Sequence, residues 1–216
     1  MSKAGIKYGK RLTSPDYAAI AENAEKSVLK ALGLERPEDL VAKVRPEDLL
    51  VRAADVVRQA DAEMAVHLDD RDRSMAHLWF YEPRLGLARA AGLTIVGFRH
   101  ALARLVYGNK THPLPDVDSN EELARVGEEL GVEPVEDAEE KFLKAAPLGY
   151  AARIRRDKAV YYMQEAVLAL SQPPYEWGPE KIAEHAGVER KVIYKQRTTA
   201  QKRHGLHVPR SAKSKA

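Results

Sequence analysis

The sequence contains no cysteine, which excludes disulfide bridges, thiol catalysis and cysteine-ligated zinc fingers and is typical of a reducing interior. It also lacks any run of about 18 apolar residues, so it predicts no membrane span. The N-terminal segment MSKAGIKYGKRLTSP has no apolar stretch after its lysines and is not a secretory signal. We therefore expect a cytoplasmic protein with no membrane partner.

Signatures of enzymes are equally scarce. There is no glycine-rich phosphate loop and no G-x-S-x-G elbow. His204 and His207 have no acidic residue nearby that would complete a metal site. The carboxylates of residues 116–140 lack the ligand spacing of a calcium loop. We expect no catalytic residues, no metal and no cofactor, and hence no enzyme.

The positive features are those of a helical globular protein. The chain has 216 residues, 44% of them hydrophobic and 31% charged, which is enough to bury a core. No segment alternates convincingly as a strand would. The apolar segment 93–98 follows ARAAG, so we interpret it as the start of a helix. The fold class predicted is all-α.

The apolar spacing and the helix start and stop residues predict particular helices. Ser14-Pro15-Asp16 begins one helix, which Gly33 ends, and Pro46 begins a long one. Asp69 to Asp72 and Pro147-Leu148-Gly149 predict breaks in the helical structure. The expected segments between these signals are 46–67, 74–81, 119–130, 136–145 and 151–170.

Residues 179–196, PEKIAEHAGVERKVIYKQ, are typical of a helix-turn-helix. Ile182 and Ala183 would face the partner helix, and the small Ala186 would allow close crossing. Gly187 would supply a positive φ at the turn. Val188 and Ile193 would return the second helix to the same core. Proteins that bind DNA use this geometry to lay the second helix in a major groove.

The same pattern occurs 95 positions earlier, in LARAAGLTIVGF. Gly92 is the expected turn residue there. The other matching positions are Leu87, Ala88, Ala91, Leu93 and Phe98. Two matches at one fixed offset predict two helix-turn-helix modules, at 84–107 and 179–203, in one chain.

The later motif resembles the DNA-reading motif of TetR-family repressors, which has the pattern I-A-x-x-A-G-V followed by I-Y. Those residues here are Ile182, Ala183, Ala186, Gly187, Val188, Ile193 and Tyr194. The resemblance covers under a tenth of the chain. TetR proteins carry the motif near the N-terminus, whereas here it lies near the C-terminus. The resemblance therefore implies only the geometry of a DNA-reading helix, without ligand sensing or the TetR fold.

Charge is distributed unevenly along the chain. Residues 181–216 contain ten Lys or Arg and two acids, a net charge of +8, and residues 116–140 contain eleven acids and one base, a net charge of −10. A basic surface attracts phosphate and releases counterions. The candidate DNA-binding residues of the later motif are Arg190, Lys191, Tyr194, Lys195, Arg197, Thr198, Lys202 and Arg203. Those of the earlier motif are Thr94, Arg99 and Arg104, with packing or dimerisation as the alternative role.

These signals predict five segments. They are a basic flexible arm at 1–13, an N-terminal helical domain at 14–109, an acidic linker with short helices at 110–148, a C-terminal helical domain at 149–208 and a basic tail at 209–216. The linker would be a spacer, or a DNA mimic that masks the basic module.

The function predicted is sequence-specific binding of double-stranded DNA, as a transcriptional regulator or a plasmid or phage maintenance factor. It would act on the bacterial nucleoid, with two motifs in successive grooves or with a homodimer on a palindrome. Two alternatives stay open. One is an adaptor that binds RNA polymerase or a partition ATPase, with secondary DNA contact. The other is a nucleoid protein without sequence preference.

Overall fold

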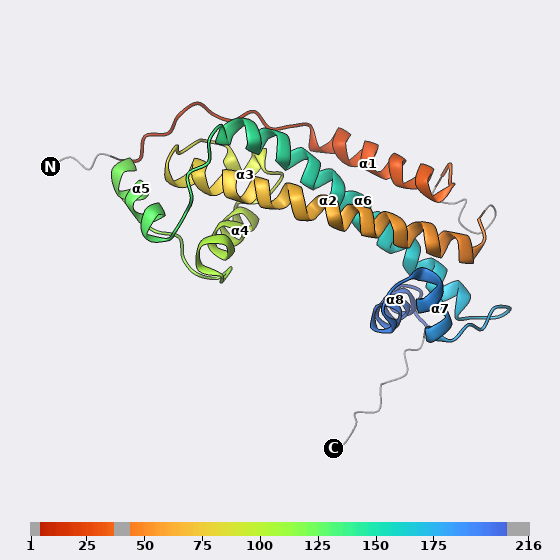
Figure 1. Cartoon of the computed structure of the whole chain (residues 1–216). Coiled ribbons are helices and arrows are strands. Elements are labelled where there is room, and N and C mark those ends of the chain that lie inside the picture. Colours follow the sequence, from red (N-terminus) through yellow and green to blue (C-terminus); the bar gives the residue numbers. More distant parts are fainter. Residues whose placement is uncertain (1–4, 37–43, 207–216) are drawn as a thin grey trace, which may run out of the picture. The chain divides into compact units, whose positions relative to one another are not determined.

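The computed structural model describes residues 5–36 and 44–206, and every regular element in that part of the chain is a helix. The first four are α1 (Tyr17–Leu32), α2 (Pro46–Phe80), α3 (Leu87–Ala90) and α4 (Ile95–Tyr107). The others are α5 (Asn120–Glu129), α6 (Ala138–Leu170), α7 (Pro179–Ala186) and α8 (Arg190–Arg203) (Figure 1). The predicted all-α class is confirmed. The predicted tail at 209–216 lies outside the described residues.

The chain divides into two compact units, and each unit is built from segments distant in sequence. Unit 1 comprises the described residues within 1–22 and 62–153, and unit 2 those within 23–61 and 154–216. The boundaries fall inside α1, α2 and α6. This division differs from the predicted one, which placed consecutive stretches of chain in separate domains. A pattern read along the sequence does not show that one helix contributes to two cores.

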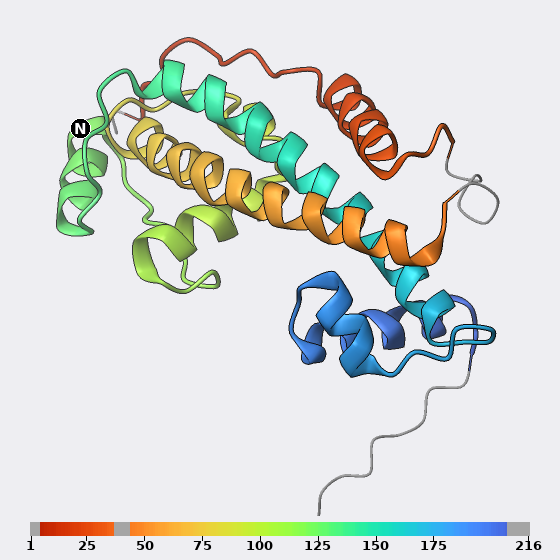
Figure 2. The same ribbon diagram turned by 45° about the vertical axis from the view of Figure 1, so that its right-hand side comes forward.

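Unit 1 has its own hydrophobic core. Figure 2 shows α3, α4 and α5 gathered near the C-terminal end of α2. Phe80 and Phe142 are fully buried, and Leu102 and Leu123 are buried with them. The segment predicted as an acidic linker therefore belongs to this core, through Leu123 of α5 and Phe142 of α6. Its acidic residues lie on the outside of elements whose inner faces are apolar.

From residue 5 onward the N-terminal arm contacts the rest of unit 1. The backbone N–H groups of Gly9 and Leu12 donate to the carbonyls of Pro83 and Leu85, at 2.9 and 3.0 Å. Leu12 is buried in the core. A few backbone hydrogen bonds and one apolar anchor thus connect residues 5–13, which have no periodicity of their own, to unit 1.

Both predicted helix breaks are absent, and the two longest helices are continuous. In α2 the polar stretch stays helical because its one inward-facing charge, Arg71, is paired: Arg71 Nε donates to Asp72 Oδ1 at 2.8 Å. On the outside, Arg73 pairs with Asp69 one turn earlier, at 3.1 Å. Hydrophobic burial resumes at Met75.

Pro147 lies inside α6, where it removes one backbone donor. The buried residues Phe142, Ala146 and Ala152 flank it and hold both sides of the helix in place. Two residues on, a Cβ at Gly149 would lie 2.9 Å from Leu68 Cδ2. The glycine thus allows α6 to approach α2 closely within unit 1, and it is a packing residue rather than a helix breaker.

Unit 2 has a second core, formed by parts of α1, α2 and α6 together with α7 and α8. Figure 2 shows α7 and α8 near the C-terminal end of α6. Leu50, Tyr162 and Leu170 are fully buried, as are Ile182 of α7 and Ile193 of α8. Pro46 begins α2 and the left-handed Gly33 follows α1, as predicted. The residue that caps α1 is Asp16, whose Oδ1 accepts from the N–H groups of Ala18 and Ala19.

The turn at Gly187 gives the first testable prediction. Gly187 has φ 62°, a conformation that costs an L-residue about 1–2 kcal/mol, and a β-branched side chain fits it worst. We expect Gly187→Val to lower the free energy of unfolding by at least that amount. The matched control is Gly178→Val, because Gly178 has an ordinary φ of −67° and only the end of the Glu180 side chain within 4 Å. Urea denaturation followed by circular dichroism measures both. Equal stability of the two variants would contradict the assigned role of the turn.

Candidate nucleic-acid interface

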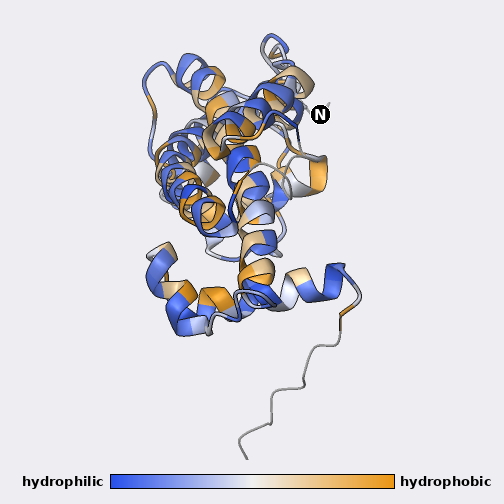
Figure 3. Cartoon of the chain, turned by 90° about the vertical axis from the view of Figure 1, so that its right-hand side faces the viewer, coloured by the Kyte–Doolittle hydropathy of each residue, from blue (hydrophilic) through white to orange (hydrophobic). Residues whose placement is uncertain are grey.

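Helices α7 and α8 form a contacting pair whose inner side chains belong to the core of unit 2. Ile182, Ala183 and Ala186 of α7 and Ile193 of α8 are buried, as the sequence predicted. A backbone hydrogen bond follows the Gly187 turn: the N–H of Val188 donates to the carbonyl of Ala183 at 3.0 Å. Arg58 of α2 donates to the carbonyl of Ala186 at 3.2 Å. This hydrogen bond satisfies a carbonyl at the C-terminal end of α7, which has no partner within the helix. Figure 3 shows orange and blue residues mixed along these helices, as expected for one buried and one solvated face.

The outer face of α8 is basic. The helix contains six Lys or Arg residues and no acid. Arg190, Lys191, Tyr194 and Lys195 are exposed on its first turns, and Lys202 is exposed near its end. Arg197 and Thr198 are half-buried. The spacing of 190, 194 and 198, and of 191 and 195, follows the helical repeat, so these predicted residues share one side of α8.

An aromatic ring organises the cations at the start of α8. Arg190 Nη2 donates to the hydroxyl of Tyr194 at 2.6 Å, and its Nη1 lies 2.7 Å from Glu180 Oε1 of α7. The guanidinium carbons of Arg190 and Arg197 lie 5.1 and 5.5 Å from the centroid of the Tyr194 ring. The hydrogen bond to Tyr194 raises the pKa of Arg190, with a smaller contribution from Glu180. The arrangement holds two guanidinium groups beside one exposed ring.

The C-terminal end of α8 is tied to α6 by contacts that the sequence analysis missed. Arg203 Nη1 lies 2.5 Å from Glu165 Oε1, and its guanidinium also contacts Gln164 and the ring of Tyr161. His204 Nε2 lies 2.8 Å from Glu165 Oε2. The predicted DNA contact Arg203 is thus engaged within unit 2. The signal available in the sequence was the spacing of Tyr161, Gln164 and Glu165, which places polar groups on one side of an otherwise apolar helix.

Gln164 makes a second link from α6 to α8. Its Nε2 donates to Gln196 Oε1 at 2.8 Å, and the residue is only 7% exposed. A buried amide costs free energy unless its groups are hydrogen-bonded, and here both the Nε2 and the oxygen are used. The position of α8 against α6 is therefore fixed by polar contacts as well as by the burial of Ile193.

The segment of the earlier predicted motif forms the short helix α3 and the longer helix α4. Leu87, Ala91 and Phe98 are buried and Gly92 has φ 66°, matching the pattern around Gly187. Yet α3 has only four residues. The predicted DNA contact Thr94 is the N-cap of α4, where its hydroxyl accepts from the N–H of Gly97 at 3.0 Å.

The exposed side of α4 is less basic than that of α8. The predicted contacts Arg99 and Arg104 are exposed. Between Thr94 and Arg99, however, Ile95 is 67% and Val96 61% exposed. The start of α4 thus exposes an apolar pair beside its candidate DNA contacts.

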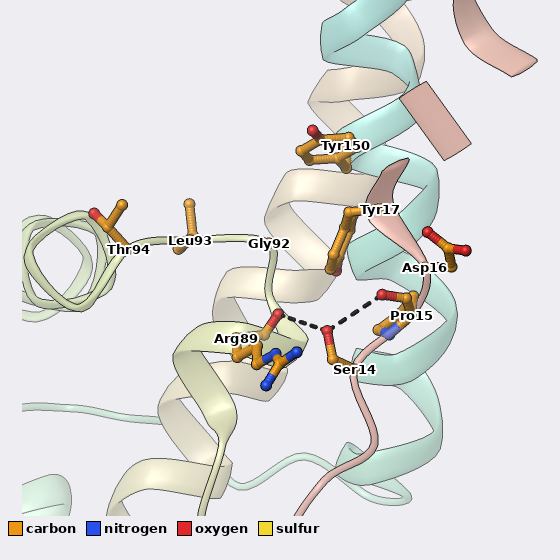
Figure 4. A pocket seen from close by; sticks show the side chains of 9 residues that line it. All are labelled: Ser14, Pro15, Asp16, Tyr17, Arg89, Gly92, Leu93, Thr94 and Tyr150. Carbon is orange, nitrogen blue, oxygen red and sulfur yellow. Dashed lines mark hydrogen bonds between the residues drawn. The ribbon is translucent and has the colours of Figure 1, made fainter. Parts of the chain in front are cut away.

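A hollow of about 620 Å³ lies at the turn between α3 and α4 (Figure 4). The hydroxyls of Ser14 and Tyr17 that line it have partners within unit 1. Ser14 donates to carbonyl oxygens of Pro15 and Arg89, and the hydroxyl of Tyr17 donates to the carbonyl of Ala90 at 2.6 Å. Burial raises the pKa of Tyr17 to about 12. A Cβ at Gly92 would lie 2.9 Å from the ring of Tyr17, so this hollow marks a tight packing contact.

Among the helices of the described residues, none has the length and apolarity needed to cross a membrane. Within residues 5–36 and 44–206, no three His, Asp or Glu side chains gather so that they could hold a metal ion. Comparisons of the chain with models of protein families, with curated proteins and with solved structures found no match.

The link between α6 and α8 gives the second prediction. Glu165 is 16% exposed in its side chain and accepts from both Arg203 and His204. We expect Glu165→Gln to lower the free energy of unfolding by about 1–2 kcal/mol, because charge-assisted hydrogen bonds in a shielded place contribute more than those in open solvent. Chemical denaturation measures the change.

The control is the same substitution at Glu189, whose pair with Lys191 at 2.6 Å is widely exposed, with side-chain exposures of 68% and 79%. Glu189→Gln should change stability by less than about 0.5 kcal/mol. If Glu165→Gln were as mild as this control, the polar link would not hold α8 in place.

Proposed function

We propose that the protein binds double-stranded DNA in a sequence-specific way, with α8 as the recognition helix in a major groove. One observation carries the proposal: α8 has six cations and no acid, follows a left-handed glycine turn, and is fixed by its buried side so that its basic side is exposed. Phosphate neutralisation by such a surface supplies most of the sequence-independent affinity of DNA-binding proteins. The residues near the start of a recognition helix contact base edges.

The residues of α8 would have different roles in binding DNA. Arg190 and Arg197, held beside Tyr194, are suited to bidentate contacts with guanine O6 and N7. Lys191, Lys195 and Lys202 are exposed point charges suited to phosphate. Thr198 is on the same side and can hydrogen-bond a base or a phosphate. Arg203 would contribute least, because Glu165 neutralises it.

The pair α3–α4 is the proposed second DNA contact. Thr94, Arg99 and Arg104 would face the groove, with fewer cations and therefore a smaller electrostatic share. A homodimer with two copies of α7–α8 on a palindrome is the other way to reach two half-sites. The activity would be transcriptional regulation or plasmid or phage maintenance, in the bacterial cytoplasm at the nucleoid, and without catalysis.

One observation favours the second candidate, an adaptor protein. Ile95 and Val96 are widely exposed at the start of α4, and exposed apolar residues are common at protein interfaces. Footprinting on the protein's own genomic neighbourhood in moderate salt separates the candidates. A repeated protected sequence supports the regulator, and uniform protection supports a nucleoid protein without sequence preference. Absence of protection would leave the adaptor.

The third prediction concerns the recognition helix. We expect Arg190→Ala and Arg197→Ala each to weaken binding to the protected fragment by about 1–3 kcal/mol, because each removes one base contact. Fluorescence anisotropy at fixed salt measures affinity, and circular dichroism verifies the helical content. Lys30→Ala, which removes an exposed cation from α1 of the same unit, is the matched control and should leave affinity unchanged. Wild-type affinity of both arginine variants would overturn the assignment of α8.

The fourth prediction separates one DNA contact from two. If α4 enters a groove, Arg99→Ala and Arg104→Ala should remove protection from one part of the footprint and leave the part covered by α8. The reason is that each motif would occupy its own groove, about 34 Å from the other along one face. A footprint of unchanged extent and intensity would show that α3–α4 only packs.

A further inference from the structure

A groove of about 680 Å³ lies in unit 1, on the exposed side of α4. Its walls come from the N-terminal arm, the end of α2, the start of α4 and the segment 110–117. Small-molecule sites in proteins are largely preformed and typically measure about 300–1,000 Å³. The groove has the size of such a site.

Apolar and aromatic side chains form much of the wall. Trp79 and Leu114 line it, and so do Tyr8 and Val96, which are 44% and 61% exposed. Trp79 is held by an edge-on contact with Phe98 of α4, at 5.4 Å between ring centroids. The indole N–H of Trp79 is buried and has no acceptor in the part of the chain that the structure describes.

Two cations and one acid line the groove, together with two histidines. Arg99, Lys110, His100 and His112 line it, against one acid, Asp116. Arg99 and Lys110 are exposed, and no ion pair with a described residue neutralises either of them. The hollow beside Gly92 is different, because the hydroxyls of Ser14 and Tyr17 there are bonded within the protein. Charge complementarity in the groove therefore favours an anion.

Two contacts fix the walls in place before any ligand arrives. The side-chain amide of Asn120 accepts from the N–H of Lys7 at 2.8 Å and donates to its carbonyl at 2.9 Å, which holds the arm. The ring of His112 stacks on Tyr107 at 3.8 Å, which holds the segment after α4. A preformed wall reduces the entropy that binding must offset.

We propose that this groove binds a small amphipathic anion, with a planar apolar body against Trp79 and Val96 and a carboxylate toward Arg99 and Lys110. The site goes beyond the proposed DNA binding and does not depend on it. A bound ligand would cover Arg99, so where α4 also contacts DNA the two would compete.

The test uses the full-length protein without DNA, labelled with ¹⁵N, and follows the two indole N–H cross-peaks by NMR. Trp177→Phe assigns them, because the chain has two tryptophans. The probe is 2-naphthoate, and its neutral counterpart is 2-naphthamide. We expect 2-naphthoate to shift the Trp79 cross-peak in a saturable way and to leave that of Trp177 in place. The amide should bind more weakly.

Arg99→Ala and Lys110→Ala should each raise the Kd for 2-naphthoate, by up to about fivefold for a partly exposed ion pair. Lys144→Ala removes an exposed cation of unit 1 that does not line the groove, and it should leave the Kd unchanged. An unshifted Trp79 cross-peak, equal shifts of both tryptophans or equal binding of the amide would each overturn the proposal. None of these results bears on DNA binding by α8, so the two proposals can fail separately.

Discussion

Burial of Ile182 and Ile193 on either side of the Gly187 turn is the constraint on which the candidate interface depends. Both side chains are fully buried in the core of unit 2. With these two positions fixed inward, the helical repeat leaves Arg190, Lys191 and Lys195 outward. The basic surface is thus a consequence of where the apolar residues must go. Polar contacts from Gln164 and Glu165 then fix the far end of α8.

The basic and the acidic stretches of the chain occupy different kinds of position in the structure. Six cations of the basic stretch lie in one helix, α8, whose outer side is exposed and available to a polyanion. The acidic stretch at 116–140 is neither a loose spacer nor a free tail, because Leu123 and Phe142 bury its helices in unit 1. The acids occupy the solvated side of packed helices. A net charge of +3 for the whole chain conceals both arrangements.

The two helical pairs share a turn but differ in what they expose. Both have a left-handed glycine, at 92 and 187, and both bury most of the apolar positions that the repeat matched. The first pair, however, exposes Ile95 and Val96 where the second exposes Arg190 and Lys191. A left-handed glycine turn in both helix pairs therefore does not indicate that both pairs bind the same partner. We regard α8 as the principal proposed contact with DNA and the surroundings of α4 as the place where small molecules or proteins could act.

The sequence by itself determined the helical class, the turns and the buried face of α8, because periodicity and glycine at a left-handed turn are local properties. It did not determine the continuity of α2 and α6. Pro147 and the polar stretch around Arg71 are local signals for a break, and burial of flanking side chains together with the Arg71–Asp72 pair overrides them. Tertiary structure likewise decided three further features: the contacts of residues 5–13 with the rest of unit 1, the division of single helices between two cores, and the groove beside Trp79. Each depends on residues far apart in the chain, whose meeting no local pattern records.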